Sequence, residues 1–328
     1  MYSFNNKKYM NLVKIHSISK KILVALLGGF LLVFLLFHAT ANLLILRHDD
    51  GAWYSAFCHF MGTNIFVKVF EVLLMATFVL HICFTSWLWF TNRKARPVRY
   101  HQPTRSKTHS GSKLMMWTGI LIFVCLIVHF TDFYFVKLGW VKGEYMVKVE
   151  KLQQIDELQT LQLSSQFDMT PEEFVDELES RATEISEMEG DAAETARYIA
   201  QLRDGLEVLN IMQRAYDEGN VTEDGVWIRH LTYEERQLLR EVVPESDPEP
   251  DFYFMAREKF SHLHIVLLYL FFFAIVWIHM RHAFPSAFQT LGLSNYKYYN
   301  IIDLLGKLYT WVVCLMFAAV VILVFLGL

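Results

Sequence analysis

Five long apolar runs dominate this sequence and leave few folds open to it. They cover approximately residues 22–46, 65–91, 114–136, 263–283 and 308–328. A helix needs about 20 residues to cross a hydrocarbon core roughly 30 Å thick, and a single segment of this length satisfies its own backbone hydrogen bonds in lipid only as a helix. The composition is also 54% hydrophobic. The sequence therefore predicts an all-α membrane protein with five transmembrane helices.

Basic residues predict which ends of these helices face the cytoplasm. Residues 1–21 carry five lysines and residues 92–113 carry seven lysines or arginines, and neither segment contains an acidic residue. Such segments are retained on the cytoplasmic side of a membrane. We therefore expect a cytoplasmic N-terminus, with residues 137–262 and the C-terminus on the outer (periplasmic) side.

Residues 137–262 differ from the rest of the chain in composition. Between Glu144 and Lys259 there are 29 acidic and 11 basic side chains, a net charge of −18, whereas the whole chain carries −4. The sequence thus predicts three parts. Residues 1–136 form the N-terminus and helices one to three, residues 137–262 form an acidic insert, and residues 263–328 form helices four and five.

Capping patterns and periodicity predict helices within this insert. Thr170 with Glu173, and Thr232 with Glu235, match the capping box that marks a helix start. Apolar residues recur at three- and four-residue steps over 191–217, which predicts an amphipathic helix. We expect a small helical subdomain. A solvated acidic spacer is the alternative, and no catalytic motif occurs in the insert.

Four of the five apolar runs hold a histidine well inside, namely His38, His81, His129 and His279. The first and third helices run outwards, so a rise of 1.5 Å per residue places His38 and His129 about 23 Å from the cytoplasmic face. The second and fourth helices run inwards, which places His81 and His279 in the cytoplasmic half. The histidines thus form two pairs at two depths.

Two imidazoles at one depth suit a b-type haem, whose iron takes one axial ligand on each face. Filled axial positions favour electron transfer over oxygen chemistry. A zinc site would need four clustered ligands, and a proton relay would need carboxylates among the histidines, whereas the runs carry only Glu71 and the interfacial Asp132. Histidines that only hydrogen-bond between helices are the plainer alternative. We expect two bis-histidine sites that bind haem iron.

Several motifs resemble those of one family. The segments "GFLLVFLLFHATANLLI", "YSAFCHFMGTNIFVKVFEVLLMATFVLHI", "NRKARP", "LIVHFTDF" and "HMRHAFPSAFQTLG" are similar to the single-chain, five-helix cytochrome b subunit of succinate dehydrogenase and fumarate reductase. The resemblance covers the four histidine-bearing runs and excludes the acidic insert. It implies a dihaem four-helix core with a peripheral fifth helix. In that core His38 and His129 hold the distal haem b, and His81 and His279 hold the proximal one.

The resemblance also implies a function and partners. Electrons would pass between an iron–sulfur subunit and a membrane quinone, menaquinone, in a bacterial cytoplasmic (inner) membrane. The dicarboxylate chemistry would belong to a separate flavoprotein on the cytoplasmic face, and no nucleic acid is expected as a partner. Some quinol:fumarate reductases of this family have a glutamate two residues before the fourth-run ligand. Trp277 stands there in this chain, so the direction of the reaction stays open.

Five further residues are site candidates, each with an ordinary interfacial role as its alternative. His59 matches a family histidine near the quinone region, and Glu71 lies about 9 Å into the second run; both are quinone-site candidates. His16 matches a family histidine before the first run. Together with Arg281 and His282 it lies at the cytoplasmic edge, where contacts with a haem propionate or a partner subunit are expected.

Two other functions remain possible on sequence grounds. The chain could be a haem-free structural anchor whose histidines only pack or bind quinone. It could also be the cytochrome b subunit of a hydrogenase or a formate dehydrogenase. Both alternatives share the predicted membrane helices with the first hypothesis, so helix prediction does not separate them.

Overall fold

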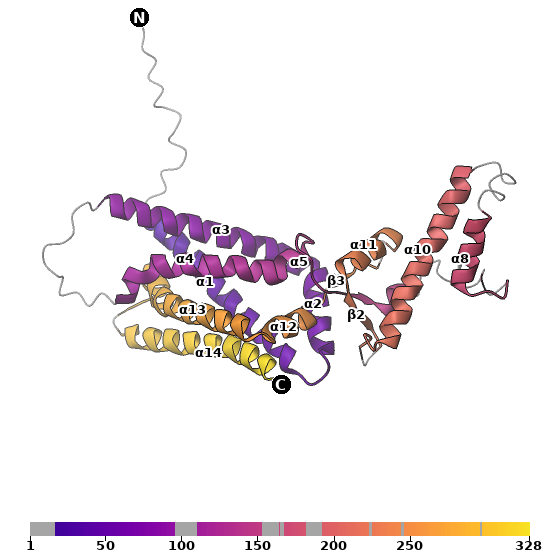
Figure 1. The fold of residues 1–328 in the computed structure, drawn as a ribbon. Coiled ribbons are helices and arrows are strands. Elements are labelled where there is room, and N and C mark those ends of the chain that lie inside the picture. The colour runs from indigo at the N-terminus through magenta and orange to yellow at the C-terminus, as the bar shows by residue number, and fades with distance from the viewer. Residues whose placement is uncertain are drawn as a thin grey trace, which may run out of the picture. The chain divides into compact units, whose positions relative to one another are not determined.

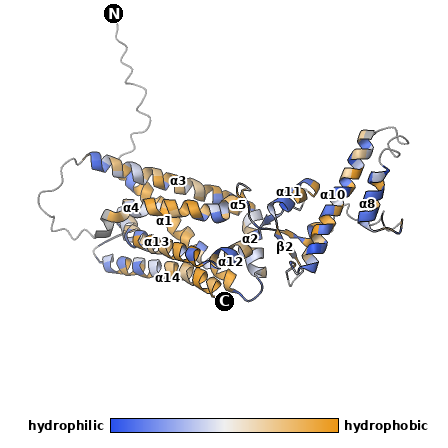
Figure 2. Cartoon of the chain, viewed as in Figure 1, coloured by the Kyte–Doolittle hydropathy of each residue, from blue (hydrophilic) through white to orange (hydrophobic). Residues whose placement is uncertain are grey.

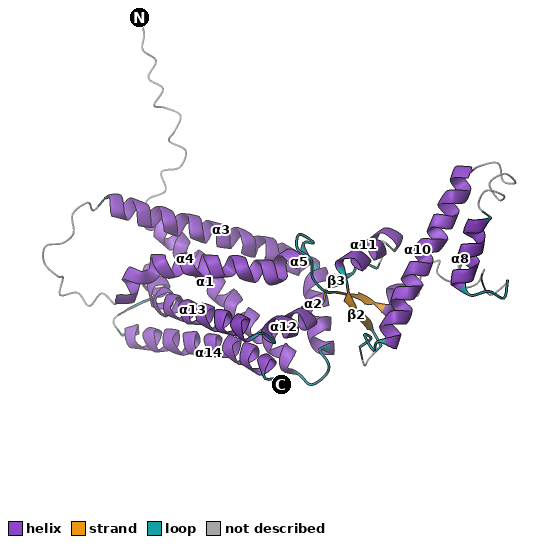
Figure 3. Ribbon diagram, in the orientation of Figure 1, coloured by secondary structure: helices purple, strands orange, loops and turns teal. Residues whose placement is uncertain are grey.

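The computed structural model describes residues 17–95, 110–152, 164, 167–181, 192–222, 225–243, 246–295 and 297–328. Helices make up most of these residues (Figure 1, Figure 3). Contacts within the chain define two compact units. The membrane unit comprises Met1–Leu46, Phe60–Val128 and Phe260–Leu328, and the insert unit comprises Arg47–His59 and His129–Lys259. Residues 47–59 therefore belong with the insert although they are far from it in sequence.

Five helices are long and apolar enough to cross a membrane. They are α1 (Ser17–Asn42), which η1 (Leu43–Leu46) extends as a 3-10 helix, α3 (Ile65–Lys94), α4 (Ser110–His129), α13 (Leu263–Thr290) and α14 (Tyr299–Phe325). After α4 the third span continues through the π-helix η2 (Phe130–Tyr134) and the short α5 (Phe135–Lys137). Figure 2 shows these helices as mainly hydrophobic. The predicted all-α membrane fold with five helices is confirmed.

Local polar residues set the ends of two of these helices. The Asn64 side chain accepts hydrogen bonds from two backbone N–H groups in the first turn of α3, at 2.9 and 3.3 Å. This cap separates α3 from α2 (Ala52–Thr63). Helix α14 begins at Tyr299, before the apolar run expected from residue 308. Its first turns are polar and are stabilised by an i,i+4 ion pair between Asp303 and Lys307 at 2.7 Å.

Helix α14 packs along α13 and α1 in the membrane unit. The backbones approach closely at Gly306, where a Cβ atom would lie 2.9 Å from the Phe284 ring of α13. Small residues allow such approach between helices in lipid. The Tyr309 hydroxyl donates a hydrogen bond to the Leu32 carbonyl of α1. A buried cluster joins the three helices, formed by Ala39, Val276, Met280, Val313 and Cys314.

The insert unit is built on a small antiparallel sheet that the sequence did not predict. Its strands are β1 (Tyr145–Lys148), β2 (Trp227–Leu231) and β3 (Glu249–Pro250), in the order β2-β1-β3. Strands this short give too few residues for an alternating pattern to be recognised. Helices α6 (Val149–Leu152), α10 (Ala192–Asp217), α11 (Tyr233–Val242) and α12 (Phe252–Phe260) contribute apolar side chains to the core beside the sheet.

The helices that the sequence predicted within the insert are confirmed. Both capping boxes are formed, by Thr170 with Glu173 at the start of α8 (Pro171–Ser180) and by Thr232 with Glu235 at the start of α11. Helix α10 matches the amphipathic pattern over 191–217. Helices α8 and α10 share a small apolar core formed by Phe174, Val175 and Leu202.

A buried charge cluster ties residues 47–59 to the rest of the insert unit. The Arg229 side chain is 7% exposed and that of Asp251 is 0% exposed, with 3.4 Å between Arg229 Nε and Asp251 Oδ2. These two atoms form an ion contact without hydrogen-bond alignment. Arg229 also donates to the Ser55 hydroxyl at 3.0 Å, and its guanidinium lies 3.8 Å from Asp50. One arginine thus links β2 to the segment before α3.

Asp251 has a second role as the cap of a helix. Its Oδ1 atom accepts a hydrogen bond from the backbone N–H of Phe254 in the first turn of α12, at 3.0 Å. Burial raises the pKa of this carboxyl above its ordinary value, and the nearby Arg229 opposes the rise. The charged form therefore depends on Arg229 in particular.

We predict that Asp251→Asn destabilises the insert unit. The substitution leaves the Arg229 charge buried with only Asp50 as an acidic neighbour, so we expect a loss of roughly 3 kcal/mol, the lower end for removing one partner of a buried pair. The free energy of unfolding is measured by pulse proteolysis of the full chain in a urea series.

The matched control is Asp176→Asn, which removes the same charge from an exposed position on α8 and should change the stability little. Because burial raises the pKa of Asp251 in the folded state, wild type should gain stability relative to Asp251→Asn as the pH falls through that raised pKa, since the folded protein then binds a proton that the unfolded chain does not. An equal effect of both substitutions would contradict the structural role of the buried cluster.

Candidate functional site

The two histidines predicted for the proximal pair lie in the same unit and interact. His81 is on α3 and His279 is on α13, and the two imidazoles are close enough for their charges to interact. His282, one turn further along α13, also interacts electrostatically with His279. The structure therefore brings together the histidines that the sequence paired by depth in the cytoplasmic half.

Helix α4 fixes the orientation of the His279 ring. Thr118 Oγ1 lies 3.0 Å from His279 Nδ1. The Thr118 hydroxyl also lies 3.1 Å from the carbonyls of Leu114 and Met115, to which it donates its single proton. While it donates to these carbonyls it accepts towards His279, and in that arrangement Nδ1 carries the proton and Nε2 carries the lone pair of the neutral ring. Nε2 is then the nitrogen that can bind a metal.

The His81 ring is placed differently, against the backbone of α1. Its Nδ1 atom is buried and has no hydrogen-bond partner among the described residues. A Cβ atom at Gly28 would lie 3.5 Å from His81 Cε1, and one at Gly119 would lie 3.7 Å from His279 Cε1. A glycine thus faces each ring of the pair. A buried polar nitrogen without a partner is unfavourable by about 1–3 kcal/mol, so this position favours a ligand that would satisfy the ring.

His38 has a different environment from His279. It lies near the end of α1, between the rings of Phe34 and Phe317 at centroid distances of 5.4 and 5.7 Å. Asn42 Nδ2 donates to the His38 carbonyl at 2.7 Å and lies 3.4 Å from His38 Nδ1. Because an amide nitrogen only donates, this weaker contact favours the lone pair on Nδ1. That tautomer is the opposite of the one at His279.

His129 is the last residue of α4 and directly precedes the π-helix η2. A π-helical turn is uncommon and often occurs at functional sites. The His129 ring contacts Phe133 at a centroid distance of 5.3 Å, and Asp132 in the same turn pairs with Lys259 at 3.1 Å. His129 belongs to the insert unit and His38 to the membrane unit. The distal pairing of these two histidines stays a prediction.

His59 has a partner that the sequence did not identify. Its Nδ1 atom lies 2.5 Å from Glu249 Oε1 on β3, and its ring meets the Trp227 ring of β2 edge-on at a centroid distance of 5.3 Å. The 190 residues between His59 and Glu249 explain why sequence spacing gives no sign of the pair.

The remaining predicted residues are placed as follows. Glu71 is partly buried on α3, and Arg281 and His282 are partly buried on α13 close to His279 in sequence. His16 lies outside the described residues.

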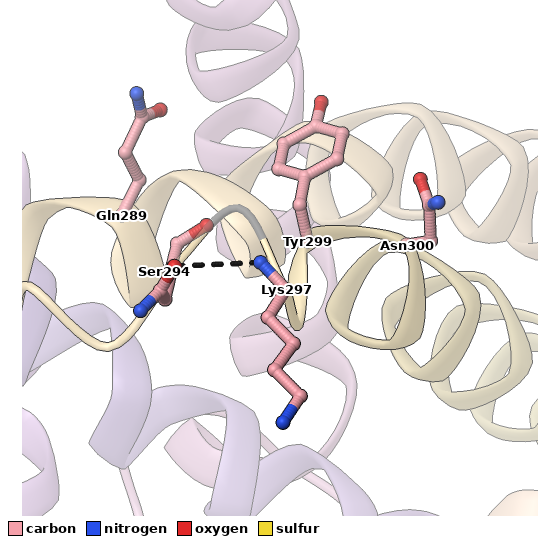
Figure 4. Close-up of a pocket in the computed structure, with 6 residues that line it drawn as sticks. Gln289, Ser294, Lys297, Tyr299 and Asn300 are labelled. Atoms are coloured by element: carbon pink, nitrogen blue, oxygen red, sulfur yellow. Dashed lines mark hydrogen bonds between the residues drawn. The ribbon is translucent and has the colours of Figure 1, made fainter.

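An open cavity of about 600 Å³ lies at the turn between α13 and α14. Figure 4 shows polar side chains around it, with Tyr299 and Asn300 at the start of α14 and Gln289 near the end of α13. The Lys297 side chain extends away from Gln289 and Tyr299 in this view, so the polar groups do not converge on one point. None of the predicted site residues lines this cavity.

No family model matches this chain, and no curated protein or solved structure matches it. Within the described part of the chain, no group of three or more His, Cys, Asp or Glu residues could hold a metal ion. A bis-imidazole iron needs only two protein ligands because a porphyrin supplies the other four nitrogens. His81 and His279 are two described histidines from different membrane helices whose charges act on each other.

We predict that Thr118→Val weakens the membrane unit through His279. The substitution removes the acceptor for the Nδ1 proton, and we expect a loss of about 0.6–1.7 kcal/mol, as for other hydrogen bonds between membrane helices. Steric trapping of the chain in detergent measures the free energy of unfolding.

Thr85→Val is the matched control. The Thr85 hydroxyl bonds to the His81 and Ile82 carbonyls of its own helix, so its loss should have little effect on stability. If Thr118→Val and Thr85→Val gave the same small change, the hydrogen bond between Thr118 and His279 would have no energetic role.

Proposed function

We propose that this chain is the membrane-anchor cytochrome b subunit of a succinate:quinone oxidoreductase, a succinate dehydrogenase or fumarate reductase. It carries electrons through two b haems between an iron–sulfur subunit and a membrane quinone, menaquinone. The observation that carries the proposal is geometric: His81 and His279 lie on two apolar helices of the membrane unit, and a glycine of a neighbouring helix faces each ring, Gly28 at His81 and Gly119 at His279. Each histidine comes from a different helix, as axial ligands on opposite faces of one haem require.

The details of the proximal pair support haem binding. The hydrogen bond to Thr118 leaves Nε2 of His279 free of a proton, and a partner on the second ring nitrogen is the usual support for a metal-bound histidine. The buried, unsatisfied Nδ1 of His81 and the glycine beside each ring add to the fit. A bound b haem supplies a one-electron carrier. His81 and His279 would hold its iron from both sides and exclude other axial ligands.

The remaining parts of the proposal concern topology and partners. The basic N-terminal segment and the basic segment before α4 support a topology in which those ends of the helices face the cytoplasm of a bacterial cell, across its inner membrane. The iron–sulfur subunit and the flavoprotein would dock there, with the dicarboxylate site on the flavoprotein. The acidic insert and the C-terminus would lie on the outer side. His38 and His129 would hold the second haem, and His59 and Glu71 are the candidates for contact with the quinone.

We predict that His81→Ala and His279→Ala each remove one of two b haems. The haem content per chain should fall by half in either variant, because one imidazole cannot replace the second axial ligand. The pyridine haemochrome assay and the reduced-minus-oxidised spectrum measure this. His264→Ala is the control, since His264 is an exposed residue at the first turn of α13 and both haems should remain.

A wild-type chain that shows no b-type spectrum would overturn the proposal. The haem-free structural anchor would then be the better reading, because the hydrogen bond between His279 and Thr118 would also serve simple helix packing. If both haems are present, the soluble subunits that purify with the chain decide the complex. A hydrogenase or formate dehydrogenase subunit in place of the flavoprotein would contradict the assignment to succinate:quinone oxidoreductase.

A further inference from the structure

Basic side chains gather at the end of the membrane unit where α1 begins and α3 ends. Lys20 and Lys21 lie near the start of α1, and Arg93 and Lys94 lie in the last turn of α3. The two helices pack against each other, and Lys20 Nζ lies 4.2 Å from the centre of the Trp87 ring on α3. Figure 2 shows the last turns of α3 as hydrophilic on an otherwise mainly hydrophobic helix. We call these four cations the basic edge.

No carboxylate of the membrane unit neutralises the basic edge. The unit contains two acidic residues, Glu71 and Asp303, and residues 1–48 and 72–131 contain none. Asp303 is already paired with Lys307 at 2.7 Å within α14. Glu71 lies about 33 Å from the end of α3, at 1.5 Å per residue. Within the described part of the chain, none of the four cations has an ion pair or a side-chain hydrogen bond.

The helix dipole does not explain this arrangement. Cations are favourable in the last turn of a helix and unfavourable near its start. Arg93 and Lys94 therefore complement α3, whereas Lys20 and Lys21 lie at the unfavourable end of α1. An external anion between the two helix ends would offset this unfavourable charge.

Aromatic rings hold two of these cations beside the exposed helix surface. Lys20 Nζ lies over the Trp87 ring, and the Arg93 guanidinium lies 5.4 Å from the centre of the Trp89 ring. Trp87 is 52% exposed, and its indole N–H has no hydrogen-bond partner among the described residues. Tryptophan is enriched at the headgroup level of membranes. The rings therefore keep the ammonium and guanidinium groups where phospholipid phosphates lie.

The surfaces that adjoin the basic edge are apolar. Such helix faces contact acyl chains in a bilayer, since lipid tails are as apolar as leucine. A phospholipid carries an acyl chain and a phosphate in one molecule, whereas free phosphate or a soluble protein would leave these faces uncovered. Exposed apolar residues recur at helical steps on both helices, namely Ile18, Ile22 and Leu26 on α1 and Leu80, Trp87 and Phe90 on α3.

We propose that the basic edge binds the headgroup of an anionic phospholipid, with Lys20, held by Trp87, as its main contact. The phosphate oxygens accept hydrogen bonds from the Lys20 ammonium and the Arg93 guanidinium, and such charge-assisted bonds are the strong ones. The acyl chains lie along the exposed apolar faces of α1 and α3. This inference goes beyond the proposed function and does not depend on haem binding.

The test measures lipid binding to the purified full chain by native mass spectrometry in detergent. The probes are dioleoylphosphatidylglycerol and dioleoylphosphatidylcholine, which share their acyl chains and differ in headgroup charge. We expect wild type to bind phosphatidylglycerol more tightly. Lys20→Gln should weaken that binding about fivefold, the contribution of one basic residue near an anionic surface, and should leave phosphatidylcholine binding unchanged.

Substitution of Trp87 tests whether the ring acts through Lys20. Trp87→Leu keeps an apolar side chain and removes the ring face, so phosphatidylglycerol binding should weaken about threefold, as for an exposed cation–π contact. Trp87→Phe keeps a ring and should retain most of the affinity. In a Lys20→Gln background, Trp87→Leu should cause no further loss, because the two residues act together.

Lys307→Gln is the matched control. Helix α14 runs parallel to α1, because Tyr309 bonds to the Leu32 carbonyl and Phe317 contacts His38 further along both helices. Lys307 therefore lies towards the same end of the membrane unit as the basic edge, but Asp303 neutralises it. Its substitution removes the same charge and should not change phosphatidylglycerol binding.

Three results would overturn the proposal. Wild type could bind both lipids equally, or Lys20→Gln and Lys307→Gln could weaken phosphatidylglycerol binding equally, which would show that only net charge matters. Displacement of the lipid by an excess of inorganic phosphate would assign the basic edge to a free anion. Size-exclusion profile and haem content should match wild type in every variant. The haem content also tests the proposed function separately.

Discussion

The fold depends on one constraint, that a polar group removed from water must find a partner inside the protein. In the membrane unit this constraint selects where a histidine can lie. His279 is accommodated because the Thr118 hydroxyl, already committed to its own helix, offers a free acceptor. In the insert unit the same constraint operates on Arg229 and Asp251, which are buried together and connect residues 47–59 to the sheet. Both units are thus organised around a small number of polar contacts within apolar surroundings.

The parts of the structure that the sequence predicted are those set by local or periodic signals. The apolar runs specified the membrane helices, and Thr170 and Thr232 marked helix starts because a capping box needs only four consecutive residues. Residue counting predicted that His81 and His279 lie at one depth, because the rise per residue of a helix converts sequence position into depth in a membrane. Their pairing as ligands stays a prediction. The sheet was not predictable from β3, which has two residues. The contact between His59 and Glu249 was missed because it depends on that sheet.

The two predicted haem sites differ in the hydrogen bond that one of their histidine rings makes within the chain. At His279 the hydrogen bond to Thr118 leaves the lone pair on Nε2, as iron coordination requires. At His38 the amide of Asn42 favours the opposite tautomer. The difference comes from one neighbour of each ring. The Thr118 hydroxyl accepts from His279, whereas the Asn42 amide nitrogen donates towards His38.

The carboxylates of the insert fall into two groups with different environments. Most of its carboxylates lie on solvated helix surfaces such as those of α8 and α10, where they favour solubility and repel one another weakly through water and salt. Glu249 and Asp251 are different, because burial raises the pKa of each and a specific cation or imidazole beside it opposes the rise. Net charge alone therefore does not decide between a spacer and a functional subdomain. Glu249 and Asp251 bear on that question because each combines a pKa raised by burial with a specific neighbour, His59 or Arg229, that opposes the rise.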